Sequence, residues 1–123
     1  MNTKIRRAYR DRVARGARRL DKIEPGWFKR IDLNHLNMAS PCNCIVGQLY
    51  VKSNVPDADN PYHDARFDDW AAALFADNRM FGDRGVSVIY GLDLDGEDRL
   101  DRDDYLTLKE RWVIEIQNRL AAR

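Results

Sequence analysis

Apolar residues recur at helical spacing along the start of the chain. Between residues 3 and 23 an apolar or small residue occupies every third or fourth position: Ile5, Tyr9, Val13, Gly16, Leu20 and Ile23. This spacing is typical of a helix that buries one stripe of its surface. Pro25 restricts the residue before it and Gly26 permits a turn, so the pattern predicts a helix over about residues 3–23.

The same spacing predicts a second helix after Ser40 and Pro41. A serine hydroxyl can accept an N-terminal backbone N–H, and proline suits the first helical position because it lacks an N–H. We therefore expect a helix over about residues 41–51. Its predicted buried face consists of Cys42, Ile45, Val46, Leu49 and Tyr50.

Two further helices are predicted in the second half of the chain from apolar stripes of the same kind. The first, over about residues 65–77, has the stripe Phe67, Trp70, Ala71, Leu74 and Phe75. The second, over about residues 103–121, has the stripe Tyr105, Leu108, Trp112, Ile116 and Leu120. Asp101 or Asp103 can cap the last helix.

Three segments lack a clear helical period. Residues 27–38 fit neither a helix nor a strand over a useful length, so we expect irregular or briefly extended chain there. Residues 52–65 collect Asn, Asp, Ser and Pro, which is typical of an exposed loop. Residues 86–90 are apolar and β-branched, and they suit either one short strand or one buried turn.

The chain length and composition fit one small helical domain. At 123 residues, with 44% apolar residues, the chain can bury a single core. We expect a mainly α fold, a bundle of about four helices joined by long loops. Trp27, Trp70 and Trp112 should be largely buried in it.

Charge is divided along the sequence although the net charge is only +1. Residues 1–22 contain nine Lys or Arg against two Asp, a net +7. Residues 57–104 contain fourteen Asp or Glu against five Arg, a net −9. A basic first helix and an acidic region therefore share one chain, and they either neutralise each other or face different partners.

Cys42 and Cys44 are the two cysteines of the chain, and they are separated by one residue. A disulfide across one residue would be strained, and zinc ligands are usually spaced two to four residues apart. On a helix the two side chains would be about 200° apart. We therefore expect reduced thiols without a metal, with Cys44 directed away from the buried face, and His35 and His63 near the surface.

The acidic stretch at residues 93–104 resembles a calcium-binding loop only in part. Acidic residues fall on several ligand positions, but Gly96 is at the fourth position rather than the sixth. Asp104 also replaces the longer glutamate of the twelfth position. The favoured interpretation is an acidic turn that stabilises the N-terminal end of the last helix.

The sequence contains no recognisable catalytic constellation. No serine lies in a glycine-flanked elbow, and no glycine-rich loop suits a phosphate. We expect a non-enzymatic protein without a cofactor. No apolar run reaches the length of a membrane span or signal segment, which predicts a cytoplasmic protein without a membrane partner.

The arginine-rich side of the first helix is the strongest functional feature. Arginine suits bidentate contact with phosphate or carboxylate. The candidate macromolecule-binding residues are Lys4, Arg6, Arg7, Arg10, Arg15, Arg18 and Lys22. This face would bind an external macromolecule, or it would pair with the acidic region of the same chain or of a second copy.

An ordered series of residues carries a resemblance to a group of phage proteins. The series contains Gly16-Ala17, Leu20-Asp21, Pro25-Gly26-Trp27, Ile31-Asp32-Leu33, Cys44-Ile45-Val46-Gly47-Gln48-Leu49-Tyr50 and Tyr90-Gly91-Leu92-Asp93. It is similar to small uncharacterised proteins of actinobacterial phages and prophages, mycobacteriophages especially. One departure is Val51, where a glycine would be expected.

This resemblance implies a phage product in the cytoplasm of the bacterial host, and it carries over no catalytic residue. We therefore predict a phage accessory protein that binds a host or phage macromolecule, with a protein as the expected partner. The alternative is a nucleic-acid-binding accessory protein that uses the basic face of the first helix. Self-association as a homo-oligomer is left open.

Overall fold

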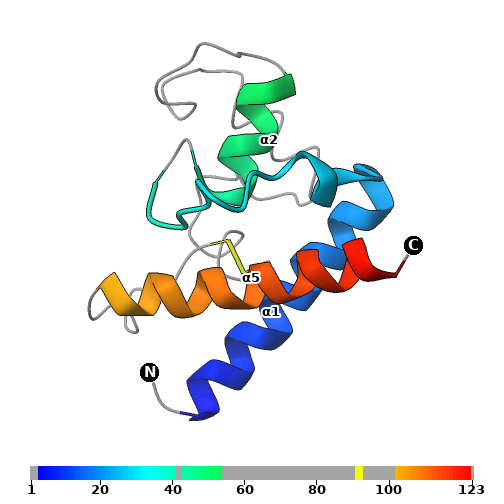
Figure 1. The fold of residues 1–123 in the computed structure, drawn as a ribbon. Helices are drawn as coiled ribbons and strands as arrows, with labels where there is room; N and C mark the ends of the chain where they lie inside the picture. Colours follow the sequence, from blue (N-terminus) through cyan, green and yellow to red (C-terminus); the bar gives the residue numbers. More distant parts are fainter. Residues whose placement is uncertain (1–2, 41–42, 54–90, 93–101, 123) are drawn as a thin grey trace, which may run out of the picture.

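Helices form most of the part of the chain that the structure describes, and no strand occurs in that part (Figure 1). The computed structural model describes residues 3–40, 43–53, 91–92 and 102–122. Its elements are α1 (Thr3–Ile23), the short 3₁₀-helix η1 (Trp27–Arg30), α2 (Ile45–Ser53) and α5 (Arg102–Ala121). The expectation of a mainly α fold is therefore confirmed for these residues.

Several predictions concern residues outside these ranges. They are the helix over 65–77, residues 54–65 of the predicted loop, the strand or turn at 86–90 and most of the acidic stretch at 93–104, together with Cys42, His63 and Trp70. The prediction of a loop from residue 52 is wrong for residues 52 and 53, because α2 continues to Ser53.

Helices α1 and α5 cross each other, and their apolar stripes form the centre of the core (Figure 1). The bounds of α1 are those predicted, and α5 begins one residue earlier than expected. The predicted stripe residues Tyr9, Val13 and Leu20 of α1 are buried, as are Leu108, Trp112 and Ile116 of α5. Both helices are thus specified by apolar periodicity, and the end of α1 also by Pro25 and Gly26.

The turn after α1 brings Trp27 into the core. Glu24 N–H still donates to Leu20 O, and Gly26 then takes a left-handed conformation with φ of 80°. Residues 27–30 form η1, so the prediction of an irregular segment is wrong for this first turn. Trp27 is fully buried and meets Trp112 edge to face, with ring centroids 5.7 Å apart. Such a pair contributes about 1 kcal/mol beyond its buried area.

Helix α2 begins later than predicted. The α-helix starts at Ile45 rather than at about residue 41, although Ser40 Oγ accepts a 3.3 Å hydrogen bond from Asn43 N–H. Cys44 is the residue immediately before the helix, and its Sγ accepts a 3.3 Å hydrogen bond from Gly47 N–H. Cys44 therefore occupies the N-cap position, where a side-chain acceptor satisfies a free backbone donor.

The prediction that Cys44 points away from the core is wrong. Its side chain is buried among the core residues. The angle of about 200° between Cys42 and Cys44 holds only inside a helix, and Cys44 precedes the helix. Its direction is set by the capping bond instead.

Gln48 connects α2 to the segment that follows η1. Its buried side-chain amide accepts a 2.7 Å hydrogen bond from Asp32 N–H and donates to Asp32 O at 3.2 Å. The amide nitrogen also donates to Asn43 O at 3.0 Å. A buried amide is stable only when its polar atoms are paired, so Gln48 fixes residues 32 and 43 against α2.

Gly91 lies where α1 and α5 meet. Trp112 Nε1–H donates a 2.7 Å hydrogen bond to Gly91 O, so the buried indole is satisfied. A Cβ at residue 91 would lie 2.6 Å from the backbone N and Cα of Val13, and the φ of Gly91 is 70°. Both the space and the backbone conformation therefore require glycine.

Replacing this glycine tests the close approach. We expect Gly91→Ala to lower the free energy of unfolding by about 3 kcal/mol or more, because the new methyl group meets the backbone of α1. Gly26→Ala is the matched control, since Gly26 also has positive φ but a Cβ there would meet no atom of the described residues within 4 Å. Gly26→Ala should lower the free energy of unfolding by only about 1 kcal/mol. If urea unfolding shows that both variants lose the same free energy of unfolding, the close approach of Gly91 to the backbone of Val13 is contradicted.

Candidate functional site

The basic face of α1 is exposed to solvent. All five candidate cations with described side chains are exposed: Arg7, Arg18 and Lys22, predicted opposite the apolar stripe, and Arg10 and Arg15, predicted toward its flanks. Lys4 and Arg6 belong to α1, but their side chains lie outside the described part. We call the five exposed cations the basic face.

Three cations of this face have no partner in the described part of the chain. Arg10 Nε lies 3.3 Å from Asp11 Oδ1, which is a local pair between neighbouring exposed residues. Among the described residues, no hydrogen bond or ion pair engages the side chains of Arg7, Arg18 or Lys22. Exposed cations of this kind remain available to an external anion.

Asp11 interrupts the basic face near its middle. At about 100° per residue it lies on the same outer side of α1 as Arg7 and Arg18, and it falls between them along the axis. Its side chain is 67% exposed, and it faces solvent rather than the core. The face is therefore basic with one acidic position near its centre.

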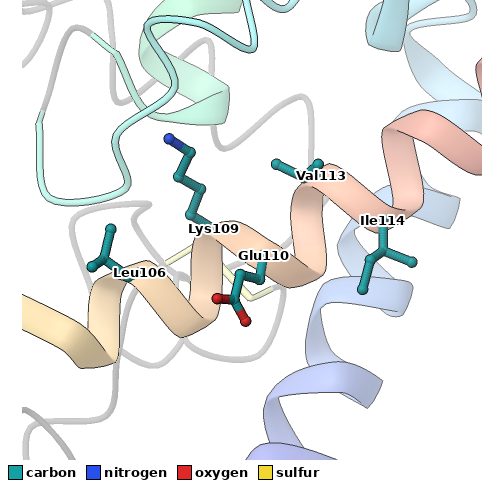
Figure 2. Close-up of a pocket in the computed structure, with 5 residues that line it drawn as sticks. All are labelled: Leu106, Lys109, Glu110, Val113 and Ile114. Carbon is teal, nitrogen blue, oxygen red and sulfur yellow. The ribbon is translucent and has the colours of Figure 1, made fainter.

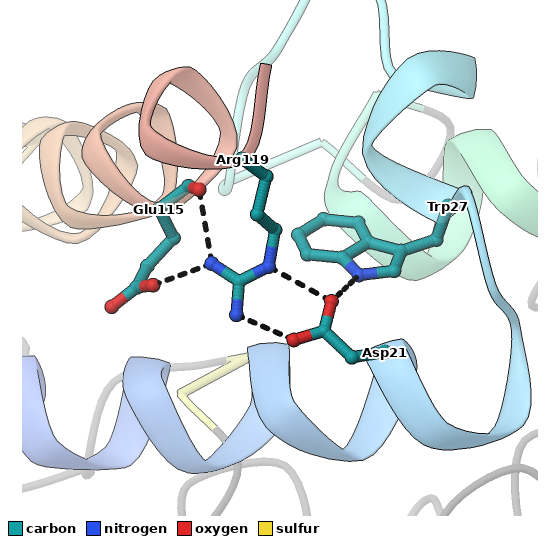
Figure 3. Close-up of polar contacts among 4 residues, drawn as sticks. All are labelled: Asp21, Trp27, Glu115 and Arg119. Carbon is teal, nitrogen blue, oxygen red and sulfur yellow. Dashed lines mark hydrogen bonds and ion pairs between the residues drawn. The ribbon is translucent and has the colours of Figure 1, made fainter. Parts of the chain in front are cut away.

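A second acidic residue of α1, Asp21, lies beside the basic face and holds α1 to α5 (Figure 3). Arg119 of α5 donates to both Asp21 oxygens, from Nε at 2.8 Å and from Nη2 at 2.7 Å. Trp27 Nε1–H donates to the same carboxylate at 2.9 Å. One carboxylate thus joins α1, η1 and α5.

Glu115 completes this group of four residues, which we call the Asp21 cluster. Arg119 Nη1 donates to Glu115 Oε2 at 2.7 Å and to Glu115 O at 3.0 Å, one turn earlier on α5. The guanidinium also lies over the ring of Trp27, 5.7 Å from its centroid. Arginine suits this place because its planar fork can bind two carboxylates while it stacks on an indole.

The cluster shifts the titration of its members. The pKa of Asp21 lies below its ordinary value of 3.8, chiefly because Arg119 donates hydrogen bonds to the carboxylate. Partial burial opposes this shift, and the Trp27 hydrogen bond adds to it. The pKa of Arg119 is raised above its ordinary value, chiefly by the hydrogen bond to Asp21, so this guanidinium stays charged.

Sequence reasoning did not find the Asp21 cluster. In this cluster α1 supplies the acid and α5 supplies the arginine, whereas the predicted pairing of the α1 arginines with the acidic region at residues 57–104 concerns residues that lie largely outside the described ranges. Asp21 and Arg119 are 98 residues apart in the sequence. No local pattern identifies such a pair, although each residue lies beside an apolar stripe near a helix end.

A strip of mixed chemistry on α5 was also not predicted. Leu106, Val113 and Ile114 lie together with Lys109 and Glu110 along an open groove of about 530 Å³ (Figure 2). Leu106 is 49% exposed and Ile114 is 38% exposed, and these are large apolar side chains to leave in water. We call these five residues the α5 strip.

A second hollow, of about 550 Å³, lies between residues 34–39 and the start of α5. Its polar side chains are those of Asn34, His35, Asn37, Tyr105 and Lys109, and His35 is exposed, with Nδ1 2.6 Å from Asp32 Oδ2. The prediction that His35 lies near the surface is confirmed.

Within the described ranges, no group of three or more His, Cys, Asp or Glu side chains is placed to hold a metal ion. None of the helices in those ranges combines the length and the apolar character that crossing a bilayer requires.

Comparison of the chain with protein-family models, with curated proteins and with solved structures finds no match.

The Asp21 cluster predicts a specific dependence of stability on pH. Because the folded pKa of Asp21 is depressed, its charge stabilises the fold above its ordinary pKa of 3.8, and this stabilisation is lost as the pH falls through the folded pKa. We expect Asp21→Asn to be about 1 kcal/mol less stable than the wild type at neutral pH, after allowance for solvent screening. The difference should shrink steadily below the ordinary pKa.

Urea unfolding at a series of pH values between about 7 and 2.5 measures this difference. The control is Asp11→Asn, because Asp11 is more exposed than Asp21 and its ion pair is a local one with the neighbouring Arg10. If Asp21→Asn stays less stable than the wild type by the same free energy down to the lowest pH, the lowered pKa of Asp21 is contradicted.

Proposed function

We propose that this chain is a non-enzymatic phage accessory protein that binds a host or phage protein through the basic face of α1. The observation that carries this proposal is the pattern of charge on that face. Arg7, Arg18 and Lys22 are exposed without an ion pair inside the described part of the chain, and Asp11 lies among them.

The length of the basic face suits a macromolecule rather than a small ligand. Arg7 and Lys22 are separated by about 22 Å along the helix axis, at 1.5 Å per residue. The face is convex, and it follows one side of a straight helix (Figure 1). Small molecules usually bind in concave sites, whereas an extended convex face binds another surface.

Asp11 favours a protein partner over a nucleic acid. A phosphate backbone is uniformly negative, so an exposed carboxylate near the centre of the contact would be repelled by it. A protein surface can place acidic groups against the arginines and a basic group against Asp11. Arginine also binds carboxylates in the bidentate way that such a surface requires.

The phage origin rests on the resemblance to actinobacterial phage proteins, and with it we place the chain in the cytoplasm of the bacterial host. Several residues that carry this resemblance have structural roles: Asp21 and Trp27 belong to the Asp21 cluster, Gln48 fixes residue 32, and Gly91 accepts from Trp112. The resemblance therefore supports a common fold. We propose that a fourth helix over residues 65–77 completes the bundle.

A nucleic-acid-binding function is the second candidate. The supporting observation is that long cationic side chains continue along one face of α1 over its whole described length. Such a face would neutralise several phosphates, and binding would then fall steeply with salt concentration.

Partner capture from host lysate tests the protein-binding proposal. We expect a specific protein to be recovered with and without nuclease. Recovery should fall about tenfold or more in the variant Arg7→Glu/Arg18→Glu/Lys22→Glu, because three favourable charge contacts become repulsive. Arg18→Glu alone should also lower the recovery of the partner. Lys29→Glu is the charge-matched control for this single variant, since Lys29 is exposed on η1 rather than on α1. Equal recovery by the triple variant and the wild type would contradict the use of this face.

Asp11→Asn distinguishes the two candidates. A protein partner that places a basic group against Asp11 should bind this variant more weakly than the wild type, because that charge contact is lost. Duplex DNA should instead bind the variant more tightly, because a repelling charge is removed. Retention on DNA that falls steeply with salt and rises in Asp11→Asn would establish the nucleic-acid function in place of protein binding.

A further inference from the structure

Five exposed residues of α1 form a single row along the outer side of the helix: Arg7, Asp11, Arg15, Arg18 and Lys22. At about 100° per residue, they fall within about 80° of one another around the helix axis. We call these five residues the charged row. Its charges are positive, negative and then positive three times, over a length of about 22 Å. The row therefore presents a fixed order of charges to an external partner.

The spacing within the charged row matches that of a second helix. Its members follow one another at intervals of 4, 4, 3 and 4 residues, a mean rise of about 5.6 Å per step. Residues on one side of a partner helix recur about every 5.4 Å, so the two rows stay within about 1 Å of register over four steps. Residues on one face of an extended strand recur about every 6.7 Å and are about 4 Å out of register after four steps. The spacing therefore favours a helix over a strand.

Asp11 is the one short side chain of the charged row. Ala8 and Ala14, three residues to either side of it, carry only a methyl group and are half-buried. The row is therefore lower at Asp11 than at its long cations. The side chain of Asp11 remains 67% exposed beside its local partner Arg10. A long lysine or arginine of the partner can therefore reach this carboxylate.

We infer that the partner presents an acidic helix, which packs antiparallel to α1 along the charged row. This inference rests on the proposed function, and it names the element of the partner protein that binds. The partner helix carries one basic residue opposite Asp11 and acidic residues opposite the four cations of the row. Its charged positions then recur at i, i+4, i+7, i+11 and i+15, with the basic residue at i+11.

The order of charges in the row selects the antiparallel orientation. Acidic residues stabilise the N-terminal end of a helix, and basic residues stabilise its C-terminal end. In the antiparallel orientation, the first turns of the partner helix face Lys22 and Arg18 and are acidic. Its basic residue lies in its C-terminal half, opposite Asp11. A parallel partner would place this basic residue in its N-terminal half, where the helix dipole disfavours it.

Three designed peptides test this inference on the full chain. The matched peptide is an alanine-rich helix with lysine at i+11 and glutamate at the other four positions, and a covalent staple on its far side keeps it helical. The swapped peptide has the same composition and staple, but its lysine is at i+4 and a glutamate is at i+11. The broken peptide keeps the matched order of charges without the staple, and two central prolines prevent the helix.

We expect the matched peptide to bind at low salt with a dissociation constant of about 1 mM or lower, measured from the arginine Nε–H signals of the protein in an NMR titration. The swapped peptide should bind about fivefold or more weakly, because it places like charges against Asp11 and Arg18. The broken peptide should also bind about fivefold or more weakly, because it loses the helical register. If either peptide binds as tightly as the matched one, or if the matched peptide does not bind at about 5 mM, the inference is overturned.

The same exchange of charges within the protein gives the most specific test. Asp11→Arg/Arg18→Asp reverses the order of two charges in the row, keeps the net charge and changes only exposed side chains. This variant should bind the swapped peptide about fivefold more tightly than the matched one, the reverse of the wild type. Lys29→Glu, which changes an exposed cation of η1, should keep the wild-type preference. An exchanged variant that still prefers the matched peptide would overturn the inference.

Failure of this inference is distinguishable from failure of the proposed function. Suppose that the peptides show no preference, while Arg7→Glu/Arg18→Glu/Lys22→Glu still loses the captured protein. The acidic helix is then overturned, and protein binding through the basic face stands. If capture is the same for this triple variant and for the wild type, the proposed function fails, and the inference fails with it.

Discussion

The bond between Asp21 and Arg119 is the interaction that fixes how α1, η1 and α5 meet. It is bidentate, and the same carboxylate also accepts from the buried indole of Trp27. Helix α1, the turn into η1 and the last turns of α5 therefore meet at one side chain (Figure 3). This cluster fixes one edge of α1 against α5, and the exposed side of α1 next to that edge carries the basic face.

Two other buried polar side chains of the core, those of Trp112 and Gln48, pair with backbone atoms. Trp112 donates to the carbonyl of Gly91, and Gln48 pairs with both backbone groups of residue 32. Such bonds fix segments whose sequences have no strong helical preference, because a buried polar atom without a partner would be costly. These two groups are thereby satisfied within the chain, and exposed charged side chains lie on the outer sides of α1 and α5.

Local signals predicted much of this fold and part of the candidate site. Helices α1 and α5 have long stripes with clear breakers, and the exposure of Arg7, Arg18 and Lys22 follows from the same periodicity. The start of α2 was placed too early because Ser40 and Pro41 are a strong local signal, whereas Cys44 makes the cap in the structure. The Asp21 cluster joins residues far apart in the sequence, which no local pattern reveals. The α5 strip was overlooked because its apolar residues lie beside the main stripe of that helix.

A double-mutant cycle on Asp21 and Arg119 tests the central claim most directly. The free energy of unfolding would be measured for the wild type, for Asp21→Ala, for Arg119→Ala and for the double variant. The structure predicts a coupling free energy of about 1–2 kcal/mol, because each single substitution removes the same bidentate bond. If the unfolding free energies lost in the two single variants sum to the free energy lost in the double variant within about 0.3 kcal/mol, the two residues do not interact, and the account is contradicted.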